Sequence, residues 1–201
     1  MGKKRGMKAY KLAVICLTCL FLINICGCSL PGYYEKTTVK LNKNDSITQY
    51  IIEDFSESEY SFDELLEDIR QEVEDYNKQS KTEKVKIKNV AFQNDIARII
   101  LEYQDDTAYY NINGYAFYYG SCTNATASGY NPVSKTKSTQ NGEYLDADTW
   151  NKMSGNYKIV VIHEPIRIET PSNILYVSDN VALETDKVAI TENEDLAYII
   201  F

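Results

Sequence analysis

The sequence predicts a single α+β domain: a mainly antiparallel sheet with one long amphipathic helix packed on it, followed by a C-terminal β meander. Only one segment, residues 62–78, repeats apolar side chains at helical spacing over several turns. Most of the remaining chain consists of short runs rich in β-branched and aromatic residues, separated by Pro, Gly, Asn and Asp. No repeat period of roughly 20 to 50 residues occurs, which excludes solenoids and propellers.

The composition is that of a globular protein with an uneven distribution of charge. The 201 residues are 44% hydrophobic and 25% charged, which excludes disordered, collagen-like and coiled-coil chains. Residues 1–27 hold five of the 21 basic residues and none of the 29 acids, so the rest has 16 bases against 29 acids and a formal charge of −13. Such an acidic chain is a poor candidate for binding nucleic acid or an anionic bilayer through its overall charge.

The N-terminal segment has the pattern of a secretory signal peptide. Basic residues precede Leu12–Ile25, a 14-residue stretch interrupted only by Thr18 and Asn24. A membrane-spanning helix needs about 20 apolar residues, whereas the apolar region of a signal peptide needs about 7 to 15. We therefore expect residues 1–27 to be cleaved.

The residues that follow the apolar stretch, Ile25-Cys26-Gly27-Cys28, resemble the lipobox of bacterial lipoprotein precursors. The resemblance implies that Cys28 is acylated, for example with palmitate, and becomes the new N-terminus. Two or three acyl chains anchor a protein stably to a membrane. The implied location is the extracytoplasmic face of the cell membrane, where the lipid on Cys28 holds the protein. An ordinary signal peptide, cut after Gly27 or later, is the alternative.

Residues 28–45 are predicted to be a lipidated N-terminus and flexible tether, and residues 46–201 the folded domain. The segment from Ser29 to Asn44 contains Pro31-Gly32 and has little apolar pattern. Of the five cysteines, Cys122 alone would remain as a free thiol after cleavage and acylation. The predicted domain therefore depends on its core and not on disulfides.

The first half of the domain contains the clearest local signals. Residues 46–55 suit a strand, although their apolar spacing also fits a helix. The helix at 62–78 begins with a capping box formed by Ser61 and Glu64. Residues 85–93 and 96–103 form a hairpin, because Asn94-Asp95 tolerates the left-handed backbone of a two-residue turn.

The second half is predicted from weaker signals. Residues 109–119 hold six aromatic side chains and are expected to form a strand with a bulge at Gly114. Residues 122–129 and 146–153 are candidate short helices. Six short β-type runs then form the expected meander, and the last of them, ending in Phe201, is expected to be integral to the sheet because burying its apolar side chains is favourable. The runs are residues 157–163, 166–169, 174–177, 181–183, 188–190 and 196–201.

The candidate catalytic residues are few. His163 is the single histidine and Cys122 the single free thiol of the predicted domain, so a Cys–His mechanism would require that pair. None of the G-x-S-x-G, H-E-x-x-H, P-loop or G-x-G-x-x-G motifs occurs. Many acids always allow some pair of carboxylates at a spacing suited to glycoside hydrolysis, so their number is no evidence for it. We expect no catalytic residues and no enzymatic activity.

Acidic segments and tyrosines are the residues that bear on metal and glycan binding. The acidic segments 146–148 and 192–195 lack the glycine and alternation of a calcium-binding loop, so they are better explained as a helix cap and a turn. We expect no metal site and no cofactor. Sixteen of the 17 tyrosines follow residue 28, and the exposure of Tyr109, Tyr110, Tyr115, Tyr118 and Tyr119 decides between strand packing and sugar stacking.

A weaker resemblance covers most of the chain after the lipobox. The order of EDF, the helix DELLEDIRQEVEDYN, ILYVSDNV and AYIIF is similar to that of small lipoproteins from gut clostridia. The resemblance implies one α+β domain on a Gram-positive cell surface and no catalytic residues. We expect a monomeric, non-catalytic binding or accessory module without nucleic-acid partners. The alternatives are a small cell-envelope hydrolase using His163 and a glycan-binding module using exposed tyrosines.

Overall fold

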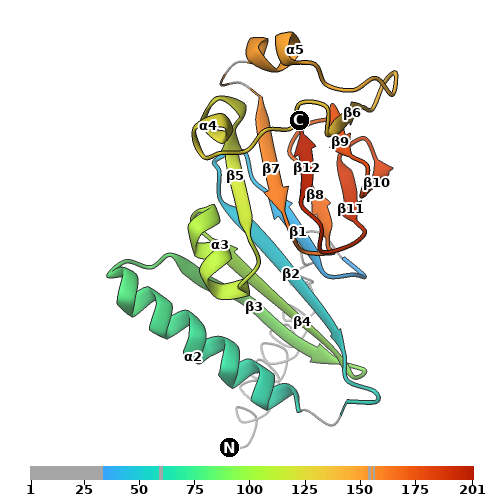
Figure 1. Ribbon diagram of the computed structural model, residues 1–201. Helices are drawn as coiled ribbons and strands as arrows, with labels where there is room; N and C mark the ends of the chain where they lie inside the picture. The colour runs from blue at the N-terminus through green and yellow to red at the C-terminus, as the bar shows by residue number, and fades with distance from the viewer. Residues whose placement is uncertain (1–33, 59–60, 154, 156) are drawn as a thin grey trace, which may run out of the picture. The chain divides into compact units, whose positions relative to one another are not determined.

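Two sheets and four helices make up the part of the chain that the computed structural model describes, residues 34–58, 61–153, 155 and 157–201 (Figure 1). The larger sheet contains β1 (Thr38–Leu41), β2 (Ile47–Asp54), β3 (Val85–Gln93), β4 (Ile96–Tyr103), β8 (Arg167–Glu169), β10 (Val181–Thr185) and β11 (Val188–Thr191). Its strand order is β10-β11-β8-β1-β2-β4-β3, and only the pair β1 and β8 is parallel.

The smaller sheet has five strands in the order β5-β7-β12-β9-β6, all antiparallel. They are β5 (Phe117–Ser121), β6 (Thr136–Ser138), β7 (Lys158–Ile162), β9 (Tyr176–Ser178) and β12 (Ala197–Ile200). Residues 34–201 form one unit. The predicted α+β class, with mainly antiparallel strands and a long helix on a sheet, is confirmed.

Helix α2 (Phe62–Ser80) is the predicted amphipathic helix. Its capping box is present, since the Ser61 side chain accepts from the Glu64 N–H and the Glu64 carboxylate accepts from the Ser61 N–H. The helix ends at Lys81, whose φ of 57° reverses the chain. Leu66 and Val73 are buried, and Val73 joins the core against the larger sheet. The acidic positions between them stay in solvent, as helical periodicity requires.

The strand pair β3 and β4 is the predicted hairpin. Asn94 and Asp95 have φ values of 52° and 61°, so both turn residues adopt the left-handed conformation of the tight turn that matches strand twist. The segment 46–55 contains β2, which settles the choice between helix and strand in favour of the strand. The short helices α4 (Cys122–Ala127) and α5 (Ala147–Lys152) also occur where the sequence predicts them.

The predicted tether is wrong for part of its length. Thr38–Leu41, which the sequence places in the tether over 28–45, form β1 between β2 and β8. Val39 and Leu41 are at most 1% exposed and belong to the main core. Two buried apolar side chains separated by Lys40 give only a short strand pattern, and the segment becomes a strand because both neighbours pair with it. The folded unit therefore begins at Tyr34 and not at residue 46.

The predicted strand over residues 109–119 is also wrong in its first half. Residues Asp106–Asn113 form α3, and the chain enters a strand only at Phe117. Asp105 caps the helix by accepting from the Ala108 N–H, and Gly114, at φ 75°, ends it with a left-handed residue. The cap and the C-terminal glycine outweigh the β propensity of the tyrosines, because Ala108 and Tyr109 together bury one helix face.

The C-terminal strands do not form a meander. Each predicted run is a strand, but only β10 and β11 pair with each other in sequence; β8 joins the larger sheet, whereas β7, β9 and β12 belong to the smaller one. Residues 136–138, which are in none of the predicted strands, add β6 beside β9. The chain thus crosses between the sheets repeatedly, and short strands carry too little pattern to indicate which sheet they join.

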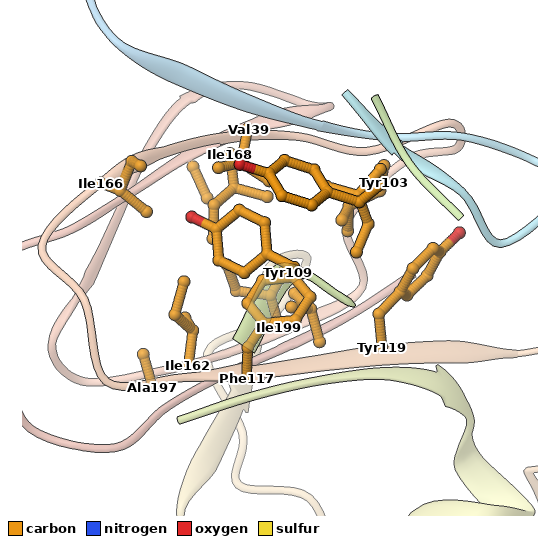
Figure 2. Packing of buried hydrophobic residues seen from close by; sticks show 14 of the residues in the cluster. Val39, Tyr103, Tyr109, Phe117, Tyr119, Ile162, Ile166, Ile168, Ala197 and Ile199 are labelled. Carbon is orange, nitrogen blue, oxygen red and sulfur yellow. The ribbon is translucent and has the colours of Figure 1, made fainter. Parts of the chain in front are cut away.

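The main core lies between the two sheets. It joins residues of β1, β2, β4, β8 and β11 to residues of β5, β7 and β12. The rings of Tyr103, Tyr109, Phe117 and Tyr119 gather there with Val39, Ile162, Ile168 and Ile199 (Figure 2). The opposite face of the smaller sheet, with Ile159, Val161 and Ile200, packs against Cys122 and Ala125 of α4, Trp150 of α5 and Leu145 in a second core. No described helix is long and apolar enough to span a membrane.

Candidate functional site

The predicted lipidation site, Cys28, lies outside the described residues. Lipidation of Cys28 and cleavage of residues 1–27 therefore stay predictions. The structure does describe the segment that follows closely, beginning at Tyr34.

Tyr34 is held on the face of the larger sheet by several side chains. Its ring packs on Tyr50 with centroids 4.3 Å apart, and its hydroxyl donates to the Glu169 carboxylate. Arg167 lies 5.6 Å from the ring centroid, and the Lys40 ammonium is 2.8 Å from Glu169 Oε1. Burial opposes ionisation of Glu169, but hydrogen bonds from Lys40 and Tyr34 hold its pKa below the ordinary value. The folded domain is thus fixed from Tyr34 onward.

The two residues of the possible Cys–His pair lie at opposite ends of β7. The Cys122 N–H donates to the Tyr157 carbonyl (3.0 Å), just before the strand, and the His163 N–H donates to the Ala116 carbonyl (3.2 Å), just after it. From Tyr157 to His163 the extended chain rises by six residues at about 3.3 Å each, so the two ends of β7 are about 20 Å apart. Cys122 and His163 therefore cannot act as a catalytic pair.

The environment of each residue agrees with a structural role. Cys122 is 1% exposed in the second core, and burial raises the pKa of its thiol to about 12, so the reactive thiolate is not favoured. The His163 ring places Nδ1 3.0 Å from the Glu194 carbonyl oxygen, which ties the end of β7 to the segment before β12.

The titratable group that sequence reasoning missed is Glu164, next to His163. Its Oε2 accepts from the Tyr109 hydroxyl at 2.8 Å, and Tyr109 is fully buried. Burial raises the pKa of Glu164, although the Tyr109 hydrogen bond partly offsets the rise. Nothing in the sequence distinguishes Glu164 from the 28 other acids, because its burial depends on α3 packing over the end of β7.

We expect Glu164→Gln to stabilise the protein at pH 7. A carboxyl whose pKa is raised on folding binds its proton more tightly in the folded state, so its ionisation costs stability as the pH rises above the unfolded value. Glutamine keeps an oxygen that can accept from Tyr109 and has no charge to bury. Urea unfolding at pH 4 and pH 7 should show a gain that is larger at pH 7.

The exposed residue Glu192 supplies the matched control for this prediction. Glu192→Gln should change the free energy of unfolding by no more than about 0.5 kcal/mol at either pH. A loss of stability in Glu164→Gln at pH 7 would show that the carboxylate contributes favourable contacts that outweigh its burial.

The five tyrosines whose exposure decides between strand packing and sugar stacking include both buried and exposed rings. Tyr109 and Tyr119 are buried in the main core, and Tyr118 packs on Tyr130 with centroids 5.1 Å apart. Tyr110 and Tyr115 are 48% and 40% exposed. Two further tyrosines outside the predicted set, Tyr144 and Tyr157, are also exposed. The aromatic run at 109–119 is therefore mainly core, and the exposed rings come from separate segments of the chain.

The two acidic segments considered for calcium have local roles. Asp146 caps α5 by accepting from the Thr149 N–H at 2.8 Å, as predicted. The second segment forms a turn in which the Asn193 side chain accepts from the Asp195 N–H. Among the described residues, no group of three or more His, Cys, Asp or Glu side chains is arranged to hold a metal ion.

An open groove of about 260 Å³ lies beside α5. Tyr157 and Tyr176 supply aromatic surface, and Met153 and Leu175 add apolar contacts. The polar side chains of the groove are those of Ser138, Gln140, Thr149 and Lys152. Lys152 has no salt bridge to any carboxylate within the described ranges. This combination of aromatic faces, hydroxyls, an amide and a cation can bind a small polar ligand.

A second hollow, of about 210 Å³, is less suited to a ligand. It lies near Asn44, Ser46 and the start of β3. Its Lys84 is paired with Asp105 at 2.8 Å and its Lys86 with Glu83 at 3.0 Å. Since these charges already have partners, the groove beside α5 is the stronger candidate binding site.

Comparisons with known proteins add no assignment: no family model matches this chain, and no match was found among the curated proteins or the solved structures.

Proposed function

We propose that this protein is a membrane-anchored extracytoplasmic lipoprotein whose folded domain is a non-catalytic binding module. The observation that carries the proposal is the lipobox-like Ile25-Cys26-Gly27-Cys28 placed directly after a signal-peptide pattern. Acylation at Cys28 would leave only residues 29–33 before the fixed Tyr34. The domain would then be held close to the membrane surface, a position suited to binding molecules at that surface.

The ligand class that best fits the groove beside α5 is a small glycan unit. Flat tyrosine faces favour the apolar side of a sugar ring, and the Ser138, Gln140 and Thr149 side chains can exchange hydrogen bonds with its hydroxyls. The volume is slightly below that of most drug-sized pockets, which favours one sugar ring over a larger ligand. Lys152 adds a preference for a carboxylated or otherwise anionic glycan.

The anchor is tested by replacing the cysteine that would carry the lipid. In cells grown with a labelled fatty acid, we expect the full chain to incorporate the label and Cys28→Ser to lose it completely, because acylation requires the thiol. The matched control is Cys26→Ser, which keeps a small residue at the second lipobox position and should retain the label. A Cys28→Ser protein that is still acylated would contradict the proposal.

The glycan class is tested by using calorimetry to measure the binding of soluble peptidoglycan fragments to the full chain. Tyr157→Ala should weaken binding by about tenfold, equivalent to about 1.4 kcal/mol, because it removes a stacking surface. Tyr144→Ala is the control, since Tyr144 is 51% exposed but lies outside the groove. Absence of binding by the unaltered protein, or an equal loss in Tyr144→Ala, would exclude this site.

A further inference from the structure

Alternation along the strands gives the larger sheet one face in the main core and one outer face. Val39, Ile99 and Ile168 point into the core. Their neighbours Thr38, Lys40, Arg98, Ile100 and Arg167 point the other way, because successive strand residues lie on opposite faces. We call this second surface the outer face of the seven-stranded sheet.

The described helices all pack elsewhere. Helices α2 and α3 contribute Val73, Ala108 and Tyr109 to the main core, whereas α4 and α5 cover the far side of the smaller sheet. Half-buried apolar side chains therefore line the outer face between its charges. They are Tyr50, Ile52, Ile96, Ile100 and Ile190.

Acidic and basic side chains are distributed unevenly over the folded structure, which the net charge of the chain does not show. The outer face carries five bases, and five acids lie on it or are paired to its bases: Lys40, Lys86, Lys88, Arg98 and Arg167, and Asp54, Glu83, Glu102, Glu169 and Glu184. Helix α2, on the other side of the sheet, carries seven acids and two bases within Phe62–Ser80. In a chain that is strongly acidic after residue 27, an anionic surface thus repels the outer face less than it repels the α2 side.

The described chain begins on this same face. Tyr34 lies against Tyr50, Arg167 and Glu169, all on the outer face. Cys28 precedes Tyr34 by six residues, which can span at most about 20 Å when fully extended. If α2 faced the bilayer, the thickness of a sheet and a helix, roughly 15 to 20 Å, would separate Tyr34 from it. That orientation would fully stretch the connection and place seven acids against the lipid.

We propose that the outer face of the seven-stranded sheet lies against an anionic lipid bilayer, with α2 turned away from it. The proposal rests on the proposed lipid anchoring at Cys28. The acyl chains supply the affinity. The short connection, together with the balanced charge of the outer face and the net negative charge of α2, sets the orientation.

The orientation has a consequence for the groove beside α5. Met153 and Tyr176 of the groove pack with the second core, on the side of the smaller sheet that faces away from the larger one. With the outer face on the bilayer, the groove opens toward the extracytoplasmic space. A ligand from the cell wall or the medium can then reach it without crossing the lipid surface.

The test uses the full, processed chain in vesicles of phosphatidylcholine with about one third phosphatidylglycerol. Asn89→Cys, on the outer face, and Glu67→Cys, on α2, are each labelled with an environment-sensitive fluorophore. Cys122 is 1% exposed and does not compete for the label. A nitroxide on the lipid headgroups should quench the Asn89→Cys label several-fold more than the Glu67→Cys label. Equal quenching, or stronger quenching on α2, would overturn the orientation.

Two further variants separate the orientation from the anchor. The double substitution Lys86→Glu and Lys88→Glu should reduce quenching at position 89 in anionic vesicles and leave it unchanged in pure phosphatidylcholine. Cys28→Ser should fail to float with either kind of vesicle. Flotation of the unaltered chain with equal quenching at both sites refutes only the orientation, whereas failure of that chain to float refutes the anchoring on which it rests.

Discussion

A chain that ends at Glu194 is expected to lose its folded structure at 25 °C. Strand β12 is central in the smaller sheet, because it pairs with β7 on one side and β9 on the other. Residues 197–201 are each at most 4% exposed. Burial of Ile199, Ile200 and Phe201 alone contributes about 1.5 to 3 kcal/mol each, which together approaches the total stability of an ordinary domain, about 5 to 15 kcal/mol.

Far-ultraviolet circular dichroism and size-exclusion chromatography measure this loss. The shortened chain should elute as an expanded or aggregated species and show no cooperative thermal transition. A shortened chain that melts at the temperature of the full domain would show that β12 is dispensable.

A single substitution measures part of this loss of apolar burial in a chain that still folds. Ile199 is fully buried between the sheets, so Ile199→Ala should cost about 2 to 5 kcal/mol through lost burial and an unfilled cavity. Leu183→Ala, at a side chain 42% exposed, is the control and should cost less than about 1 kcal/mol. Equal midpoints of urea unfolding for both variants would contradict the central position of β12.

The fold could be predicted where local signals were strong and agreed with each other. Helix α2 has an apolar stripe, a capping box and a long polar face, and the β3–β4 hairpin has a two-residue turn that favours left-handed backbone. Each feature acts within a few residues, so its energy can be assessed without the rest of the chain. The same reasoning located α4, α5 and every C-terminal strand.

The errors arose where distant residues decide the local structure. Thr38–Leu41 form a strand because β2 and β8 pair with both of its edges, and β8 lies more than 120 residues along the chain. In α3, the sequence contains the Asp105 cap and Gly114, but its tyrosine-rich composition favours a strand. The choice of sheet for each C-terminal strand depends on long-range pairing, which short strands do not encode locally.

The same difference between local signals and long-range contacts applies to the candidate site. The lipobox resemblance is a contiguous motif and could be read directly. The groove beside α5 could not, because its lining comes from β6, α5, β9 and Tyr157, none of which forms a recognisable spacing. The outer-face charges and the position of Tyr34 likewise depend on strand register. Only the fold shows that an acidic chain presents one face on which bases and acids balance.

The second large effect is expected from Tyr103→Phe, which removes one hydroxyl from a buried polar network. The Tyr103 hydroxyl donates to Gln49 Oε1 at 2.5 Å and accepts from Asn113 Nδ2 at 3.3 Å. The Gln49 amide in turn donates to Asn113 Oδ1 at 3.0 Å, so the three side chains close a ring that joins β2, β4 and α3. Tyr103 is fully buried and Gln49 is 5% exposed, so water cannot easily replace a missing partner.

Loss of the Tyr103 hydroxyl should cost about 1 to 3 kcal/mol in the free energy of unfolding, because the Gln49 oxygen is left buried without its donor. The control is Tyr110→Phe, the same chemical change at a ring 48% exposed, with an expected cost below about 0.5 kcal/mol. Urea unfolding of both variants gives the comparison. Since the network connects α3 to the larger sheet, amide exchange in α3 should also accelerate in Tyr103→Phe and not in Tyr110→Phe. Indistinguishable stabilities for the two variants would mean that the ring of hydrogen bonds contributes nothing to holding α3 in place.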